Sequence, residues 1–350
     1  MTAATTFTAS GIAVHAKVER ILGQLCAHLG EHLTVTKTDW GARLETVIGS
    51  VDLTVSSPRL KIEIACPTAS MLFTIRSMVA EHLFLFAADE PLDLSWADGP
   101  QPSRIPDLRE ISVVGARNIT PHMRRVTVAS HDVAHFSDGG LHVRLLIPPK
   151  GRMPIWPQTG IDGRIHWPRG EDALVVRAYT IRNIDLALGQ MDIDFVVHDG
   201  EDVPGASWAL GARPGDRAGL IGPGGGGVPE SRNLVLAGDE TALPAIARIA
   251  AAMPADARLQ ILLEVENAEE VQPLFTAAKH EITWFHRMGR PSGTTGTLER
   301  AIREIVARSD PSTYIWAACE QSEARAIRNF MRTEIQYDRT RFSVAAYWQR

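Results

Sequence analysis

The spacing of hydrophobic and polar positions changes twice along the chain, and the first stretch runs from about residue 12 to 90. Apolar residues recur at helical spacing over residues 15–29 and 68–86. Between them, apolar and polar residues alternate in short runs separated by turns, at residues 33–36, 44–47, 51–55 and 60–64. The pattern predicts a small α+β domain with the order helix, antiparallel sheet, helix.

The second stretch, residues 108–228, shows strand patterns and almost no helical spacing. Residues 142–147 and 191–197 are examples of the alternation. Strands at this spacing predict a closed antiparallel β-barrel. Residues 148–172 interrupt the strands with five prolines and two tryptophans, and so long an insertion is expected to be a functional rim or lid.

In the third stretch, residues 229–350, strands and helices alternate, which predicts βαβ units and a parallel sheet. The expected strands are residues 234–237, 259–265, 282–285, 314–318 and 342–348. The expected helices are residues 244–253, 268–280, 298–307 and 322–333. The fold class is therefore multidomain α+β and α/β: a small N-terminal α+β domain over 12–90, a linker over 91–107, an antiparallel β-barrel over 108–228 and a C-terminal α/β parallel-sheet domain over 229–350.

Composition restricts the function classes. The 350 residues are 45% hydrophobic and 22% charged, which is typical of a soluble protein of two or three domains. The longest candidate apolar run, residues 83–88, is far shorter than the roughly 20 residues of a membrane span. The N-terminal residues lack the basic start and long apolar stretch of a secretion signal, so a cytoplasmic location without membrane insertion is expected.

Charge and cysteines argue against two further classes. The net charge is −5 and the basic residues are spread along the chain, so no nucleic-acid surface is expected. Cys26, Cys66 and Cys319 are widely spaced among apolar residues, without a C-x-x-C motif or a Cys/His ligand pair. Buried structural thiols are therefore expected, and no metal site of the zinc or iron–sulfur type.

Three motifs carry candidate chemistry, and the first lies at residues 238–244. This turn, with the sequence G-D-E-T-A-L-P, joins the buried run 234–237 to a helix start. Such a turn directs free backbone N–H groups toward a phosphate. Alone it is weak evidence, because any turn from a strand to a helix favours glycine.

The second motif is Arg177-x-Tyr179-Thr180 at a strand end. A guanidinium binds a phosphate or pyrophosphate through two N–H groups. A tyrosine ring offers a flat apolar face with a polar tip, which suits a flat aromatic cofactor, and a threonine hydroxyl can bond the edge of such a ring. The alternative is an ordinary barrel strand in which Tyr179 only packs.

The third motif is a small-residue helix start, Gly205-Ala206-Ser207, directly ahead of Trp208. Small residues let a pyrophosphate approach the backbone N–H groups closely. His198 lies shortly before this start. The alternatives are one more hairpin turn and a strand histidine whose hydrogen bonds are satisfied within the fold.

The motifs occur in a specific order, with I-T-P-H-M-R-R-V at residues 119–126 before them and Tyr347-Trp348 at the end of the chain. In this order they resemble the siderophore-interacting protein family. The resemblance covers about residues 108–350. It implies an FAD-containing, NAD(P)H-dependent ferric-siderophore reductase on the ferredoxin-reductase-like fold, with FAD on the barrel and NAD(P)H on the C-terminal domain. Residues 12–90 resemble a small domain of unknown function that is found alone or fused ahead of such reductases.

The resemblance also implies the cofactor contacts. The flavin contacts would come from the two barrel motifs, one histidine and the C-terminal aromatic pair: Arg177, Tyr179, Thr180, His198, Ala206, Ser207, Trp208, Tyr347 and Trp348. The helix start among them would cap the flavin diphosphate. The nicotinamide contacts would come from the strand-to-helix turn: Gly238, Asp239, Glu240, Thr241 and Ala242.

Two questions stay open from the sequence. The family commonly reads G-P-A-S-x-W, whereas the tryptophan directly follows the serine here, which leaves open which N–H groups reach phosphate. Glu264 and Glu266 follow the second strand of the α/β domain, where a carboxylate suits the ribose hydroxyls of NADH and repels a 2′-phosphate. Arg287 and Arg290 follow the next strand and would do the opposite.

The implied reaction passes electrons from NAD(P)H through FAD to the Fe(III) of a ferric siderophore or ferric chelate, which releases Fe(II). The cofactor carries this chemistry, so we expect no catalytic residue. A bulky, anionic substrate predicts a partly basic mouth, with the candidates Arg124, Arg125, Arg144, Lys150, Arg152, Arg164 and Arg169. Two alternatives remain: a flavin electron transferase to a protein acceptor such as ferredoxin, and a non-catalytic siderophore-binding module.

Overall fold

The computed structural model describes residues 6–30, 33–99, 104–197 and 203–350. The chain forms two compact units. The N-terminal unit contains residues 1–108 and 155–174, and the C-terminal unit contains residues 109–154 and 175–350. Most of the insertion that interrupts the barrel strands therefore belongs to the N-terminal unit.

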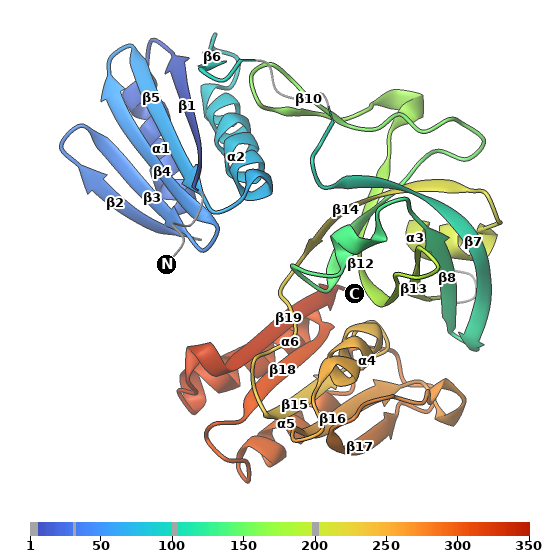
Figure 1. The fold of residues 1–350 in the computed structure, drawn as a ribbon. Helices are drawn as coiled ribbons and strands as arrows, with labels where there is room; N and C mark the ends of the chain where they lie inside the picture. Colours follow the sequence, from blue (N-terminus) through green and yellow to red (C-terminus); the bar gives the residue numbers. More distant parts are fainter. Residues whose placement is uncertain (1–5, 31–32, 100–103, 198–202) are drawn as a thin grey trace. The chain divides into compact units, whose positions relative to one another are not determined.

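The N-terminal unit is a six-stranded antiparallel sheet in the order β2-β3-β4-β5-β1-β6, with two helices packed on it (Figure 1). Its elements are β1 (Phe7–Val14), α1 (Val18–Leu29), β2 (Thr34–Thr38), β3 (Gly41–Thr46), β4 (Gly49–Ser56), β5 (Arg59–Cys66), α2 (Ala69–Ala87) and β6 (Asp93–Trp96). The apolar stripes of both helices share one core with the sheet, which includes Ile21, Leu25 and Val79. The predicted helix, sheet, helix order is present.

The hydrophobic pattern misses two strands of this sheet. β1 lies between β5 and β6, and its buried positions are Ala9, Gly11 and Ala13, whose small side chains give little apolar signal. β6 lies within residues 91–107, so the expectation of a linker is wrong for residues 93–96. Leu94 and Trp96 alternate toward the core there and are buried.

Helix α2 is long and apolar enough to cross a membrane by length and composition, in contrast to the short run that the sequence pattern singled out. Its Ile75, Val79 and Leu83 are buried in the core against the sheet. Burial of this stripe identifies α2 as a core helix of the folded unit.

The three cysteines are free and buried, which confirms the expected structural thiols. Burial raises the pKa of the thiols of Cys26 and Cys66, and it does so most strongly for Cys319. All three thiols therefore stay protonated and unreactive near neutral pH.

Residues 155–174 form a short hairpin, β10 (Gln158–Thr159) and β11 (Ile165–His166), followed by the 3-10 turn η2 (Gly170–Asp172). The indole Nε1 of Trp96 donates to the carbonyl of Asp162 at 2.9 Å. The backbone N–H of Ile165 donates to the Glu81 carboxylate at 2.9 Å, and the Arg164 guanidinium lies 3.6 Å from the centre of the Phe84 ring. The segment thus docks on α2 and β6, while its expected role as a rim or lid stays a prediction.

The C-terminal unit begins with a closed barrel in the order β12-β13-β8-β7-β14-β9. Its elements are β7 (Leu108–Thr120), β8 (Met123–Ala129), the 3-10 turn η1 (Val133–Phe136), β9 (His142–Ile147), β12 (Val175–Asp185), β13 (Gln190–Val196), α3 (Pro204–Gly211) and β14 (Arg217–Gly224). Alternate residues such as Val126, Leu145 and Phe195 fill the interior. The predicted antiparallel barrel is confirmed.

The barrel is followed by a five-stranded parallel sheet in the order β17-β16-β15-β18-β19 (Figure 1). Its elements are β15 (Asn233–Gly238), α4 (Leu243–Ala252), β16 (Arg258–Val265), η3 (Ala268–Glu270), β17 (Lys279–His286), α5 (Thr297–Val306), β18 (Tyr314–Glu320), α6 (Gln321–Asn329) with a following π-helical turn η4 (Phe330–Glu334), η5 (Arg339–Arg341) and β19 (Phe342–Trp348). One face packs against α4 and the other against α5 and α6. The predicted α/β domain is confirmed.

The helix expected over residues 268–280 is wrong. Only the three-residue turn η3 forms there, and β17 begins at Lys279. Pro273 falls inside the expected helix, where a proline removes a backbone donor and clashes with the preceding turn. The connection between β16 and β17 is therefore irregular.

Candidate functional site

A chain of hydrogen bonds joins the barrel to the end of the parallel sheet. Oγ1 of Thr180, on β12, lies 3.0 Å from Nδ1 of His142, its cross-strand partner on β9. Nε2 of the same imidazole lies 2.9 Å from the hydroxyl of Tyr347 on β19. Two predicted flavin contacts are thus linked through a histidine that the sequence did not single out.

The imidazole of His142, which links the two hydroxyls, is neutral at neutral pH. Burial, with a smaller contribution from the charge of Arg248, lowers the pKa of His142 below its ordinary value. A neutral imidazole donates through one nitrogen and accepts through the other, so it can bond both hydroxyls at once. Burial also raises the pKa of Tyr347, whose hydroxyl therefore stays protonated.

A second set of bonds ties the C-terminal aromatic pair to the strand-to-helix turn. The indole Nε1 of Trp348 donates to Oδ2 of Asp239 at 2.8 Å. The other oxygen of this carboxyl accepts from the backbone N–H of Thr241 at 2.9 Å and from its hydroxyl at 2.6 Å. Burial raises the pKa of Asp239 to about 6, although its hydrogen bonds oppose the shift. Four of the predicted cofactor residues therefore meet at the junction of barrel and sheet: Tyr347, Trp348, Asp239 and Thr241.

Tyr179 lies in an aromatic cluster at the start of α3. Its ring centre is 4.3 Å from that of Phe195, which in turn lies 5.5 Å from that of Trp208. A Cβ on Gly205 would lie 1.8 Å from the Tyr179 hydroxyl, so only glycine permits this approach. Burial raises the pKa of Tyr179 to about 12. The second and third motifs are thereby brought together, with Gly205 as the contact point.

The first turn of α3 has the features of an anion site. Ala206 is buried and Ser207 exposed, and the N-cap residue Val203 makes no side-chain capping hydrogen bond. The backbone N–H groups at such a helix start favour a phosphate. Arg177, on β12, has an exposed guanidinium that donates to the carbonyl of Val176 at 2.9 Å. These groups fit a diphosphate, whereas His198 lies outside the described residues.

Gly238 has a packing role that the sequence did not reveal. A Cβ there would lie 2.4 Å from Cβ of Ala242 and 2.7 Å from the carbonyl oxygen of Ala318. The glycine therefore lets the start of α4 approach β18 closely, and the space beside its Cα is filled by the protein. In the same turn Ala242 is buried and Thr241 partly exposed.

Glu240, from the same turn, belongs to an ionic cluster at the carboxyl ends of the strands. The Arg287 guanidinium donates to both oxygens of Glu240, at 2.9 and 2.6 Å. The same guanidinium lies 3.9 Å from the carboxylate of Glu264 and 3.3 Å from that of Glu266. Arg287, proposed from the sequence as a partner of a 2′-phosphate, is thus engaged by carboxylates.

The barrel and the sheet are also anchored to each other by buried polar groups. Glu270, in η3, accepts hydrogen bonds from the hydroxyl of Thr120 and from the backbone N–H of His122, and it pairs with the His122 imidazole at 2.9 Å. Arg248, on α4, donates to the barrel carbonyls of Leu141 and Ile181 at 3.2 Å each. The segment 119–126 therefore contributes to the junction.

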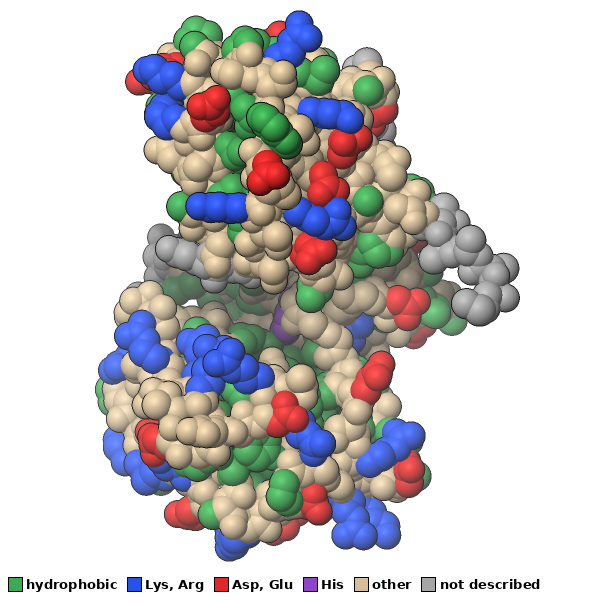
Figure 2. All heavy atoms as spheres, turned by 90° about the vertical axis from the view of Figure 1, so that its left-hand side faces the viewer, with side chains coloured by type: hydrophobic (Ala, Val, Ile, Leu, Met, Phe, Trp, Pro, Cys, Tyr) green, Lys and Arg blue, Asp and Glu red, His purple; other side chains and the backbone are tan. Residues whose placement is uncertain are grey.

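Three of the basic residues expected at a substrate mouth are engaged elsewhere. Arg124 donates to the carbonyl of Ala209 at 2.7 Å, Arg125 pairs with the buried Asp194 at 2.6 Å, and Arg164 is the side chain that stacks on Phe84. Exposed positions are held by the other four: Arg144, Lys150, Arg152 and Arg169. Over the N-terminal unit in the upper part of Figure 2, Lys and Arg side chains are interspersed with Asp and Glu.

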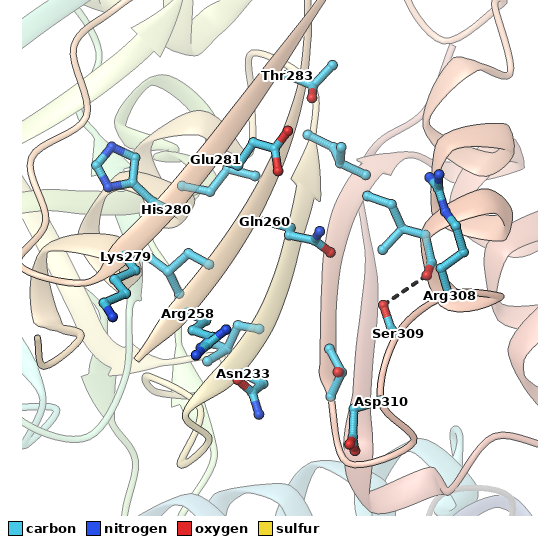
Figure 3. A pocket seen from close by; sticks show the side chains of 16 residues that line it. Asn233, Arg258, Gln260, Lys279, His280, Glu281, Thr283, Arg308, Ser309 and Asp310 are labelled. Atoms are coloured by element: carbon cyan, nitrogen blue, oxygen red, sulfur yellow. Dashed lines mark hydrogen bonds between the residues drawn. The ribbon is translucent and has the colours of Figure 1, made fainter. Parts of the chain in front are cut away.

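A hollow of about 900 Å³ lies at the opposite, amino-terminal edge of the parallel sheet. It is lined by residues at the strand starts, such as Asn233, Arg258 and Lys279, and by Arg308 and Asp310 beyond α5 (Figure 3). Because ligands of parallel sheets bind at the carboxyl ends of the strands, the hollow is not the nucleotide site.

Comparison with known families agrees with this architecture. Residues 231–350 match the family described as siderophore-interacting protein, and residues 112–227 match the siderophore-interacting FAD-binding domain. Residues 12–97 match a family described as an uncharacterized protein conserved in bacteria (DUF2218). The three matches follow one another along the chain.

Individual relatives point the same way. The ferric vibriobactin reductase ViuB of Vibrio cholerae serotype O1 is 31% identical over 247 residues, which cover 69% of this chain and 89% of that protein. The ferric acinetobactin reductase of Acinetobacter baumannii is 31% identical over 186 residues, 52% of this chain and 63% of that protein. A siderophore utilization protein from T. fusca has a TM-score of 0.61 at 36% identity, covering 72% of this chain and 95% of that one. A ferredoxin-NADP+ reductase from Plasmodium falciparum, with a TM-score of 0.50 at 12% identity over 70% of this chain and 99% of its own, shares the fold alone.

Proposed function

Because the chain belongs to the siderophore-interacting protein family, we propose that it is an FAD-dependent reductase that passes electrons from NAD(P)H to the Fe(III) of a siderophore. The observation that carries the proposal is the hydrogen-bonded chain from Thr180 through His142 to Tyr347. It joins the barrel strand of the R-x-Y-T motif to the aromatic end of the chain. Next to it, Trp348 reaches Asp239 in the nucleotide-type turn. A flavin and a nicotinamide need such a junction, where two binding elements meet.

Each group of residues has a physical task in this proposal. The Arg177 guanidinium and the first turn of α3 hold the diphosphate, and Tyr179 supplies a flat face that its neighbours Phe195 and Trp208 fix in place. Neutral His142 orients the hydroxyls of Thr180 and Tyr347 without adding a charge. When bound, FAD supplies the hydride acceptance and the single-electron transfer that side chains cannot provide. Reduction weakens the complex because oxygen ligands hold Fe(III) more tightly than Fe(II).

The substrate side is proposed on charge. Exposed Arg144 and Lys150, both in the C-terminal unit, provide positive charge for an anionic ferric chelate. We also propose a cytoplasmic location, where reduced nicotinamides are supplied. Two alternative functions have to be distinguished from this one by experiment. One is electron transfer to a protein such as ferredoxin, and the other is siderophore binding without electron transfer.

The flavin site is tested by removing Arg177. A charged hydrogen bond contributes roughly 1.5–3 kcal/mol, so Arg177→Ala should weaken FAD binding about ten- to a hundred-fold. Arg117→Ala, at an exposed position of β7, is the matched control and should keep its FAD. The FAD released per chain after purification measures both. Full occupancy in Arg177→Ala would remove the assignment of this motif to the flavin.

A further inference from the structure

An ionic cluster at the carboxyl edge of the parallel sheet contains more carboxylates than guanidinium groups. Three carboxylates, from Glu240, Glu264 and Glu266, surround the single guanidinium of Arg287. Arg287 is only 2% exposed, and Glu240 and Glu264 are buried as well. The Glu266 side chain is the accessible member, at 26% exposure. The cluster therefore presents a carboxylate, and not a guanidinium, to an incoming ligand.

Arg287 is held by several contacts at once. Its two terminal nitrogens are bonded to both oxygens of Glu240, and one of them also contacts Glu266. Its Nε is buried without a hydrogen-bond partner among the described residues. To bind a phosphate, this guanidinium would have to leave a buried carboxylate without its charge partner, which is strongly unfavourable. Arg287 therefore serves to hold the three strand ends together.

The location of this cluster gives it a meaning for the nucleotide. Gly238, at the end of β15, pairs in register with Leu263 of β16, so Glu264 and Glu266 directly follow that level of the neighbouring strand. In α/β sheets, an acidic residue at the end of the strand after the glycine turn bonds the adenosine ribose hydroxyls and opposes a 2′-phosphate. The carboxylate of Glu266 is oriented by a hydrogen bond of 2.8 Å, which it accepts from the backbone N–H of Gly289.

We infer that this edge selects NADH over NADPH, with Glu266 as the residue that determines the choice. The inference rests on the proposed function and names its electron donor. A 2′-phosphate carries close to two negative charges at neutral pH and would meet Glu266, the accessible carboxylate of a cluster in which three carboxylates share one guanidinium. Arg290 is the nearby cation that could favour NADPH, but its Nε is directed to the carbonyl of Arg287 at 3.3 Å.

Titration calorimetry of the purified, flavin-containing protein with NAD+ and with NADP+ tests the inference without turnover. The wild type should bind NAD+ at least ten times more tightly, which corresponds to about 1.4 kcal/mol. Glu266→Gln keeps an acceptor for the N–H of Gly289 but removes the charge. It should therefore strengthen NADP+ binding several-fold and lower the ratio of the NADP+ to the NAD+ dissociation constant. Glu269→Gln, an exposed carboxylate three residues on, is the matched control and should leave the ratio unchanged.

The outcomes separate this inference from the function on which it rests. A wild type that prefers NADP+, or a Glu266→Gln variant with an unchanged ratio, overturns the assignment of Glu266 while the reductase function stands. If Arg290→Ala abolishes NADP+ binding and Glu266→Gln has no effect, the choice belongs to Arg290. If neither nucleotide binds, the proposed electron donor is wrong, and the inference falls with it.

Discussion

At the scale of single residues, His142 links two predicted positions that lie far apart along the chain. It bonds Thr180 on one side and Tyr347 on the other, and its ring meets the Tyr347 ring edge-on at 5.3 Å. The motif residues can be recognised in the sequence because their types and order carry information. The role of His142 cannot be recognised there, because it depends on the register of β9 against β12, which pairs it with Thr180.

Replacing this histidine should destabilise the protein measurably. His142→Phe keeps an aromatic ring but leaves two largely buried hydroxyls without their shared partner, so we expect a loss of about 1–3 kcal/mol in the free energy of unfolding. Tyr347→Phe removes only one of the bonds and should cost about 0.5–1.5 kcal/mol. Urea unfolding measures both variants. If His142→Phe is as stable as the wild type, the hydrogen bonds from Thr180 through His142 to Tyr347 do not stabilise the fold.

Asp239 gives the protein a pH dependence that one substitution can isolate. Burial raises its pKa from 3.8 to about 6. A carboxyl whose pKa is raised on folding stabilises the folded state below its unfolded pKa, and this contribution is lost as the pH rises from about 4 to 6. Asp239→Asn does not ionise, so its stability relative to the wild type should increase over that interval, by up to about 3 kcal/mol. Thermal unfolding at several pH values measures the difference, and a constant difference across the interval would contradict the buried, ionising carboxyl.

At the scale of elements, the approach of α3 to β12 is the contact that brings two sequence motifs into one site. Only a glycine at position 205 leaves room for the Tyr179 hydroxyl. Gly211, at the other end of the same helix, has open space where a Cβ would be. The two glycines therefore separate the effect of helix propensity from the effect of this contact.

Gly205→Ala should displace Tyr179 or the start of α3 and lower the FAD content of the purified protein at least tenfold. Gly211→Ala should leave the FAD content unchanged and stabilise α3 slightly, because alanine favours a helix over glycine by up to about 1 kcal/mol. FAD released per chain is the measurement. Equal FAD content in the two variants would show that the Tyr179–Gly205 contact is not part of the flavin site.

The elements themselves were predictable where the hydrophobic period was strong. Barrel strands such as β9 and β13, the parallel strands and helices such as α4 and α5 follow the sequence pattern closely. The failures have local causes: β1 buries only small residues, β6 is four residues long within a polar stretch, and Pro273 excludes the helix expected around it. The role of Gly238 in packing α4 against β18 could not be predicted, because it depends on a strand that lies far along the chain. Its expected approach to the cofactor stays a prediction.

At the scale of the whole molecule, the N-terminal unit includes residues 155–174, which lie between two barrel strands in the sequence. The chain leaves the C-terminal unit after Pro154 and returns at Val175, two positions before Arg177. Between these points it docks on the small domain, where the backbone of Gly163, at φ +89°, is buried against Trp96. The small domain is therefore tied to a segment that leads directly into the predicted flavin strand.

Two glycines of this segment allow the docking to be tested. A Cβ on Gly163 would lie 3.0 Å from Nε1 of Trp96, whereas Gly170, which also has a positive φ, has open space around it. Gly163→Ala should loosen the segment and speed hydrogen exchange of residues 155–174 at least tenfold, which corresponds to about 1.4 kcal/mol in the opening equilibrium. Gly170→Ala carries comparable backbone strain and should leave that exchange unchanged. If both variants exchange like the wild type, the segment is not held by this contact.

The most direct measurement of the central claim is an anaerobic stopped-flow experiment on the purified protein in two steps. The flavin absorbance should bleach on mixing with NADH and return on mixing with a ferric siderophore, with two Fe(II) trapped by an iron(II) chelator for each flavin reoxidised. If the reduced flavin is not reoxidised by any ferric chelate but is reoxidised by ferredoxin, the electron acceptor is a protein and not a siderophore. A protein that purifies without FAD, or whose FAD no nicotinamide reduces, would contradict the proposed function.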